Sequence, residues 1–302
     1  MLISELIDEY ILDCEIRKYT PKTINGYRNN LNYLREYLKE HCNIYCIEEV
    51  KAKNLKAFFK YISDKGRKET YMNGLLKNFR GLFKYAVTEG YITDNPCLKI
   101  PWAKEYMPII STFNDSEVKR MLMVYNGKSY IEMRNKTILC LLFDTGIRNY
   151  ELCCLQTKCI KDDVIVISGK GKKERQVGQS AYLKKMLMKF QRIRNSYFAL
   201  KNIPDNLFLS RTGKQLTVEA VERIVKIAGE CANVRKDIRC SPHTCRHYFA
   251  QCQLKNGMDV YSLSRLMGHS NIYITQRYLN SMLDGDIVER SIETSPLMRI
   301  LY

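Results

Sequence analysis

The sequence predicts a mainly α-helical protein of two domains with one small β-hairpin. Apolar residues recur at helical spacing through most of the 302 residues. One β-branched stretch, residues 163–167, is followed by a glycine- and lysine-rich turn and a second short strand at 174–177. A stretch with two prolines and no periodicity, residues 98–113, predicts a linker between two helical regions.

Residues 1–97 predict a helical domain. The first helix places apolar residues at positions 2, 6, 7, 10 and 11, and the second opens with Thr20 as N-cap and Pro21 in its first turn. Two further helices are expected at about 53–63 and 68–89, and Gly90 ends the last of them. Basic residues on the polar faces predict either a DNA-facing surface or a solvated one. These residues are Lys22, Arg28, Lys68, Lys77 and Arg80.

Residues 114–282 predict the second domain, of mixed α and β structure. A cap at residues 114–117 begins a helix to about Tyr125, and the apolar run 138–143 predicts a buried helix that Gly146 ends. The hairpin follows, and the chain from Ala181 onward is expected to be mainly helical. The tail, 283–302, has loosely helical apolar spacing. It is expected to dock on a neighbouring subunit or to fold back on its own domain.

The net charge of +17 indicates a polyanionic partner, nucleic acid first and an anionic membrane surface second. Residues 101–302 contain 32 of the 49 lysines and arginines and 19 of the 32 acidic residues, so they carry +13 of this net charge. No apolar run approaches the roughly 18 residues of a membrane span, and the N-terminus lacks the pattern of a secretory signal. Twelve cysteines scattered in apolar contexts favour buried thiols over disulfides, so we expect a cytoplasmic protein.

Candidate functional residues are spread along the second domain. Arg148 follows Gly146 at a helix start, where a guanidinium suits a phosphate or carboxylate, although a structural ion pair is an equal alternative. Three of the four histidines lie between residues 243 and 269, and His243 with Arg246 has helical i, i+3 spacing. His269 follows Gly268 at an expected helix start, and Tyr278 stands nine residues later. The cysteine and histidine spacing at 240–247 does not match a structural zinc site, so no metal is predicted.

In combination, these elements resemble the tyrosine recombinase, or phage integrase, family. The resemblance rests on five separated elements in the same order. They are Thr145–Arg148 with Glu151–Leu152, Gly169–Gly171 with Glu174–Arg175, Ser241–His247, Gly268–Ser270 and Tyr278. Among its members, the chain looks most like Xer-type recombinases and conjugative-transposon integrases. The resemblance implies that residues 1–97 are a helical core-binding, SAM-like domain and that residues 114–282 are the catalytic domain.

The resemblance also implies roles for the candidate residues. Tyr278 is expected to attack the scissile phosphate and form a 3′-phosphotyrosyl bond, while Arg148 and Arg246 neutralise the non-bridging oxygens. Lys170 is the expected proton donor to the leaving 5′-oxygen, with Lys172 and Lys173 as rivals. His243 would accept the tyrosine proton or hold the phosphate, and His269 would donate to it. Glu151 would orient His243 or an arginine. Lys172, Lys173 and Arg175 are further candidates for DNA contact.

The predicted function is therefore site-specific DNA recombination without metal, ATP or another cofactor. The expected partners are double-stranded DNA carrying recombination sites, a homotetramer formed on DNA, and an accessory DNA-bending or excision factor. Two other functions stay open. A protein like a type IB topoisomerase would relax DNA without exchanging strands. A non-catalytic DNA-binding regulator would use the same fold but would not need Tyr278 or Lys170.

Overall fold

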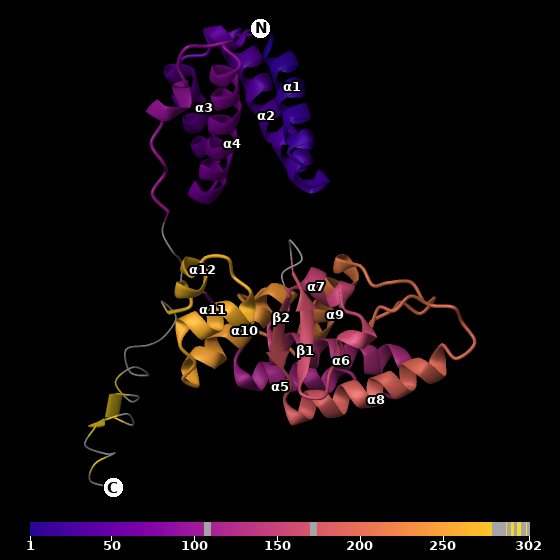
Figure 1. Cartoon of the computed structure of the whole chain (residues 1–302). Helices are drawn as coiled ribbons and strands as arrows, with labels where there is room; N and C mark the ends of the chain where they lie inside the picture. Colours follow the sequence, from indigo (N-terminus) through magenta and orange to yellow (C-terminus); the bar gives the residue numbers. More distant parts are fainter. Residues whose placement is uncertain are drawn as a thin grey trace. The chain divides into compact units, whose positions relative to one another are not determined.

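A computed structural model of the chain contains two compact units, residues 1–107 (unit 1) and 108–302 (unit 2). The structure describes residues 1–105, 110–169, 174–279, 288, 291, 292, 295, 296 and 300. The mainly helical fold class is confirmed, and the sheet among these residues has two antiparallel strands (Figure 1). The unit boundary falls inside the predicted linker. The predicted docking tail, 283–302, lies mostly outside the described residues.

Unit 1 is a helical domain around a core of mainly leucine, isoleucine and phenylalanine side chains. Its helices are α1 (Ile3–Ile16), α2 (Pro21–Cys42), α3 (Ala52–Asp64) and α4 (Glu69–Thr88), with the 3-10 turns η1 (Ile47–Glu49) and η2 (Pro96–Lys99). The predicted start of α2 is confirmed, because the Thr20 hydroxyl accepts the Thr23 amide hydrogen at 3.3 Å and Pro21 opens the helix. Phe58, Phe79 and Phe83 are fully buried where α3 and α4 join the core.

The chain after η2 is fixed to α4 by side chains of that helix. The Asn73 amide group exchanges two hydrogen bonds of 2.9 Å with the backbone of Ala103. Arg80 donates to the Ile100 carbonyl at 2.8 Å, and its guanidinium lies 4.4 Å from the ring centroid of Trp102. This guanidinium is thus bound to carbonyl and aromatic groups of its own unit, and the DNA contact expected at Arg80 stays a prediction.

Unit 2 surrounds a long buried helix, α6. The unit contains α5 (Asp115–Val124), α6 (Tyr130–Thr145), α7 (Asn149–Cys154), η3 (Thr157–Cys159), β1 (Val164–Ser168), β2 (Glu174–Gly178), α8 (Ala181–Tyr197), α9 (Val218–Cys231), α10 (Pro242–Lys255), α11 (Val260–Met267) and α12 (Tyr273–Gln276). The predicted cap of α5 is confirmed: the Asn114 side chain accepts the Glu117 amide hydrogen at 2.9 Å, and the Glu117 carboxylate accepts that of Asn114.

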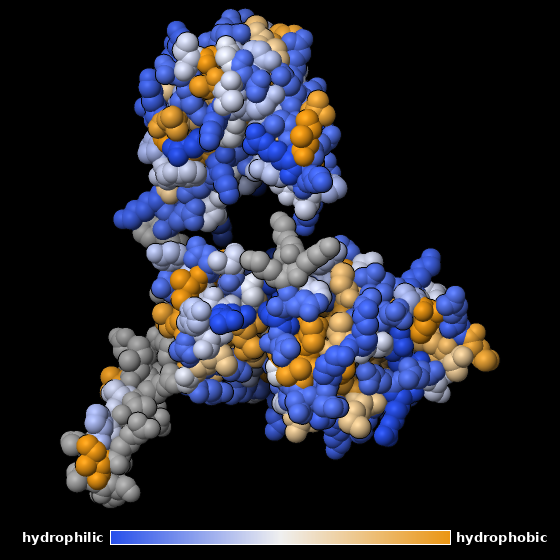
Figure 2. All heavy atoms as spheres, in the orientation of Figure 1, coloured by the Kyte–Doolittle hydropathy of each residue, from blue (hydrophilic) through white to orange (hydrophobic). Residues whose placement is uncertain are grey.

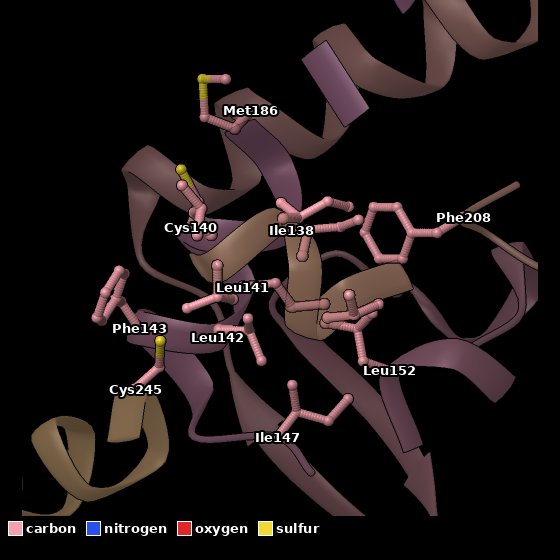
Figure 3. Close-up of a cluster of buried hydrophobic side chains, with 14 of the residues drawn as sticks. Ile138, Cys140, Leu141, Leu142, Phe143, Ile147, Leu152, Met186, Phe208 and Cys245 are labelled. Atoms are coloured by element: carbon pink, nitrogen blue, oxygen red, sulfur yellow. The ribbon is translucent and has the colours of Figure 1, made fainter. Parts of the chain in front are cut away.

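The apolar run predicted to be a buried helix forms the centre of this core. Ile138, Leu141 and Leu142 on α6 have no exposed surface, and Figure 3 shows them together with Ile147 and Leu152 from the following segment. Gly146 ends α6 with a φ of 58°, in the left-handed region that favours glycine. This turn brings the chain directly from the core helix to the start of α7.

Substituting Gly146 by alanine is expected to destabilise unit 2 by roughly 2–3 kcal/mol. The alanine would hold a positive φ, and its Cβ would lie 2.4 Å from a ring carbon of Phe249, so α6 and α10 would have to separate. Urea unfolding measures the change. Gly178→Ala is the matched control, because no atom lies within 4 Å of the added Cβ. Equal stability of Gly146→Ala and wild type would contradict the packing argument.

The β-hairpin forms as predicted. Its register pairs Val164 with Gly178 and Ser168 with Glu174, and the side chains of Ile165 and Val177 are buried. The residues between the strands include Lys170, Lys172 and Lys173, all of which lie outside the described residues.

The segment between α8 and α9 differs from the helical prediction. Residues 198–217 are irregular, with a bridge between Leu209 and Gln215. Arg194 holds this segment by donating to the carbonyls of Leu207 at 3.1 Å and Asn206 at 2.8 Å. Hydrogen bonds from a buried guanidinium thus replace helical ones for part of this backbone.

The surface of unit 2 is mostly hydrophilic on the face shown in Figure 2, with apolar side chains in small groups. No helix in the described part of the chain has both the length and the apolar character needed to cross a membrane.

Candidate active site

Three consecutive carbonyl oxygens at the end of α11 each accept a hydrogen bond from a different arginine. Leu266 accepts from Arg175 Nε at 2.9 Å, Met267 from Arg246 Nη2 at 2.6 Å and Gly268 from Arg148 Nη2 at 2.7 Å. The last carbonyls of a helix have no intrahelical donor and carry partial negative charge, so they suit cations. Gly268 ends α11 with a φ of 64°, whereas the sequence predicted a helix start there; the next helix, α12, begins at Tyr273.

Arg148 is the N-cap residue of α7, and Glu151 binds both its backbone and its side chain. Its backbone N–H donates to Glu151 Oε2 at 3.0 Å, and its Nη1 donates to Glu151 Oε1 at 2.9 Å. Glu151 therefore caps the helix and orients the guanidinium at once. The Arg148 side chain is 40% exposed, so part of it faces solvent. The prediction that Glu151 orients an arginine agrees with these contacts.

Arg175, the second residue of β2, binds the same carboxylate in a bidentate manner. Its Nη1 and Nη2 donate to the two Glu151 oxygens at 2.8 and 2.7 Å, and the side chain is 12% exposed. This guanidinium is directed inward and joins the hairpin to α7, and the DNA contact expected at Arg175 stays a prediction. Burial acts to raise the pKa of Glu151, but the hydrogen bonds and charge of Arg175, with those of Arg148, hold it below its ordinary value.

Replacing Arg175 by methionine is expected to destabilise unit 2 by about 3 kcal/mol at neutral pH, because a buried carboxylate loses its main partner. A carboxylate with a lowered pKa contributes stability above its unfolded pKa of about 4.3 and loses it as pH falls through the folded value. The difference between wild type and variant should therefore shrink in acid. Urea unfolding at neutral and acidic pH measures it, with Lys184→Met as control, because that lysine pairs with an exposed Asp163. A pH-independent difference would contradict this account.

Arg246, on α10, is 3% exposed and connects three parts of the site. It donates to the carbonyls of Gly146 and Met267, and its Nη2 lies 3.0 Å from His269 Nε2. Because a guanidinium has no acceptor, His269 Nε2 must accept. The other ring nitrogen, Nδ1, lies 2.7 Å from the Thr275 hydroxyl. Burial, with the charge of Arg148, lowers the pKa of Arg246 to about 10, which leaves it charged at neutral pH.

The Tyr278 ring is 3% exposed and packs in a small apolar cluster with Phe249 and Met267. Its hydroxyl lies 2.9 Å from Nδ1 of His247, one turn after His243 on α10. The rings of His243 and His247 are in edge contact, with centroids 4.2 Å apart. The His243 residue is itself exposed.

At neutral pH the positive charge of the site comes from its guanidiniums and not from its histidines. Burial and the nearby arginines lower the pKa of His269 to about 4 and also lower that of His243. Burial raises the pKa of Tyr278, while the charges of Arg246, Arg277 and Arg148 act in the opposite direction. The phenol is therefore protonated at neutral pH and lies within the field of the arginines.

The structure brings together most of the predicted residues that it describes. Arg148, Glu151, Arg246 and His269 are joined by hydrogen bonds, and Tyr278 is connected to His243 through His247. Lys170 cannot be placed, because it lies outside the described residues. In the described part of the chain, no group of three or more His, Cys, Asp or Glu side chains could hold a metal ion.

Sequence reasoning did not assign His247 or Thr275 a role. For His247 a signal existed, since it stands four residues after His243 and therefore on the same face of a helix. Thr275 had no comparable signal. The predicted contacts on unit 1 at Lys22, Lys68 and Lys77 lie on exposed residues, whereas Arg28 is paired with Asp8 at 3.0 Å.

Comparison with known proteins adds two family matches and several relatives. Residues 112–283 match the Phage integrase family, and residues 2–100 match the Phage integrase SAM-like domain. The tyrosine recombinase XerD of Staphylococcus aureus is 28% identical over 279 residues, 91% of this chain and 94% of that protein. The XerD of Oceanobacillus iheyensis is also 28% identical, over 87% of this chain and 88% of its own.

Solved structures with the same fold include two DNA complexes. XerH recombinase bound to a palindromic difH substrate, in a post-cleavage complex, has a TM-score of 0.76 at 20% identity, over 93% of this chain and 82% of its own. The Tn1549 transposon integrase in complex with transposon right-end DNA has a TM-score of 0.74 at 19% identity, over 98% of this chain and 100% of its own.

Proposed function

The chain belongs to the phage integrase family, and from this premise we propose that it recombines duplex DNA at specific sites through a covalent 3′-phosphotyrosyl bond to Tyr278. As a member of this family it is a tyrosine-type site-specific recombinase. The observation that carries the proposed chemistry is the arrangement of Arg148, Arg175 and Arg246 on three successive carbonyls of α11. Glu151 pairs with Arg148 and Arg175, while Arg246 donates to two carbonyls and lies against His269, so the three guanidiniums keep an excess of positive charge for an incoming phosphate.

The charge around a pentacoordinate phosphorus is the main obstacle to cleavage of a phosphodiester. We propose that Arg148 and Arg246 bind the two non-bridging oxygens and stabilise this charge. Glu151 and Arg175 do not touch the phosphate in this scheme but fix the position of Arg148. Because the tyrosyl linkage keeps the energy of the broken ester, religation requires no ATP. The proposed role of the guanidiniums requires no metal ion.

His269 fits this scheme if its hydrogen bonds change when phosphate binds. In the present arrangement, Nε2 accepts from Arg246 and Nδ1 donates to the Thr275 hydroxyl. A hydroxyl can also donate, so reversal of the Thr275 bond would place the ring proton on Nε2. Arg246 and His269 would then both turn their donors to the phosphate instead of to each other. Thr275 is therefore proposed to set the tautomer of His269.

Lys170 remains the proposed proton donor to the leaving 5′-oxygen, with Lys172 and Lys173 as alternatives. Arg175 connects β2, the strand that follows these lysines, to Glu151 beside Arg148. The hairpin would therefore deliver a lysine to the same site as the arginines. The phenol of Tyr278 is buried, so attack on an external phosphate requires its segment to move when DNA binds.

Duplex DNA is the proposed partner of both units. The structures of similar fold were solved with DNA, and the charge of +13 after residue 100 favours phosphate contacts. We further propose a homotetramer on two DNA duplexes, assisted by an accessory DNA-bending or excision factor. Binding should weaken steeply as salt is raised, because bound cations are released from DNA.

The proposal is tested with duplexes that the protein selects from a random-sequence library, each carrying a nick near the cleavage position. The expected result is a covalent adduct in denaturing gels that forms in EDTA without ATP. Two intact duplexes should then exchange strands. Loss of the adduct in EDTA would overturn the metal-free mechanism. Relaxation of supercoiled DNA without strand exchange would instead favour the topoisomerase alternative. DNA binding without a covalent adduct would favour the non-catalytic regulator.

A further inference from the structure

The hydroxyl of Tyr278 has a neighbour that the proposed mechanism does not yet use. Nδ1 of His247 lies 2.9 Å from the phenol oxygen, and the two ring centroids are 5.4 Å apart. His247 projects from α10, whose backbone is fixed by the Ser241 cap and by the buried Arg246. An imidazole on a rigid helix thus meets the atom that would attack phosphorus.

His243, the expected acceptor of the tyrosine proton, lies one turn before His247 on α10. It contacts His247 through its ring edge, at a centroid distance of 4.2 Å, and it is exposed. A proton acceptor must lie within hydrogen-bond reach of the proton that it takes. His247 meets that condition, and the exposed His243 keeps the other role expected for it, which is to hold the phosphate.

The protonation state of His247 suits an acceptor. Burial lowers the pKa of His247 to about 4, and the charged or titratable groups that add to this effect are His243, Arg246 and Arg277. At neutral pH the ring is therefore uncharged, and one of its two nitrogens has a lone pair that can accept a proton. A phosphate bound by Arg246 would offset the positive charge of this guanidinium. The pKa of His247 would then rise toward the working range of a base.

We propose that His247 is the general base for Tyr278, an inference that rests on the proposed recombinase function. In cleavage, the phenol O–H bond breaks and its proton moves to Nδ1 of His247 while the tyrosine oxygen bonds to phosphorus. The bond from phosphorus to the 5′-oxygen breaks, and the general acid, proposed to be Lys170, protonates that oxygen. In religation the 5′-hydroxyl attacks phosphorus and gives its proton back to the deprotonated Lys170, while the bond from phosphorus to the tyrosine oxygen breaks and His247 returns its proton to that oxygen.

The test is the single-turnover rate of adduct formation on the nicked duplex by His247→Asn. Asparagine keeps an acceptor near the position of Nδ1 but cannot take a proton. The expected result is a rate about 100-fold lower than that of wild type. The loss should be smaller at high pH, where the phenol loses its proton to solvent. A duplex with sulfur in place of the bridging 5′-oxygen should restore the rate of adduct formation by Lys170→Ala, because a thiolate leaves without an acid. It should not restore the rate of His247→Asn, because that variant still lacks the base.

Controls separate this role from folding. His41→Asn, on α2 in unit 1, should react at the wild-type rate, and DNA binding by His247→Asn should be unchanged. Should asparagine disturb folding, His247→Gln is the second variant. A His247→Asn rate within threefold of wild type, or a loss that is the same at every pH, would overturn the inference while the recombinase function stands. No adduct with wild type would overturn both.

Discussion

Tyr278→Phe is expected to abolish the covalent protein–DNA adduct and all strand exchange. The substitution removes one oxygen, the proposed nucleophile, and leaves the buried ring in its cluster with Phe249 and Met267. The hydrogen bond to His247 is lost from the folded protein, a change of about 1 kcal/mol. The nicked duplex, followed in denaturing gels, measures the adduct, and a mobility shift measures binding, which should persist.

Tyr273→Phe is the matched control for this experiment. Tyr273 lies five residues earlier in the same segment, at the start of α12, and is 71% exposed. The control should form adduct at the wild-type rate. An adduct that persists in Tyr278→Phe would exclude Tyr278 as the nucleophile. Loss of the adduct in Tyr273→Phe would indicate that the substitutions disturb the whole segment.

Arg148→Ala is expected to slow adduct formation by roughly 10²–10³-fold, the typical effect of removing one donor to a transition-state oxyanion. The fold should tolerate the change, because the side chain is 40% exposed and Glu151 retains its bidentate pair with Arg175. Single-turnover rates at saturating protein separate this effect from weaker DNA binding. Arg246 is less suitable for the test, since its buried guanidinium also holds the carbonyls of Gly146 and Met267.

Arg265→Ala is the control for Arg148→Ala. Arg265 is an exposed arginine of α11, whose guanidinium lies 5.9 Å from the ring centroid of Tyr261, and it has the same charge. Its replacement should leave the single-turnover rate unchanged. Equal losses in both variants would indicate that general positive charge, not the position of Arg148, accounts for the rate.

The sequence was sufficient wherever the cause is local. The start of α2 at Thr20 and Pro21, the cap at Asn114 and the end of α6 at Gly146 follow from the chemistry of one to four neighbouring residues. The buried run 138–143 follows from hydrophobicity alone. Arg148, Arg246, His269 and Tyr278 could be proposed as site residues because their separated motifs occur in the order typical of the family.

Only the tertiary structure shows that the carbonyls of residues 266–268 organise three arginines and that His247 meets Tyr278. Backbone carbonyls are the same in every residue, so no pattern of side chains indicates which helix end will receive a guanidinium. Whether an arginine binds DNA or its own protein also depends on distant partners. Arg80 and Arg175 have ordinary basic surroundings in the sequence, but Ile100 and Glu151 lie beside them after folding. The sequence by itself thus determined the elements and the candidate residues, while packing decided which groups face one another.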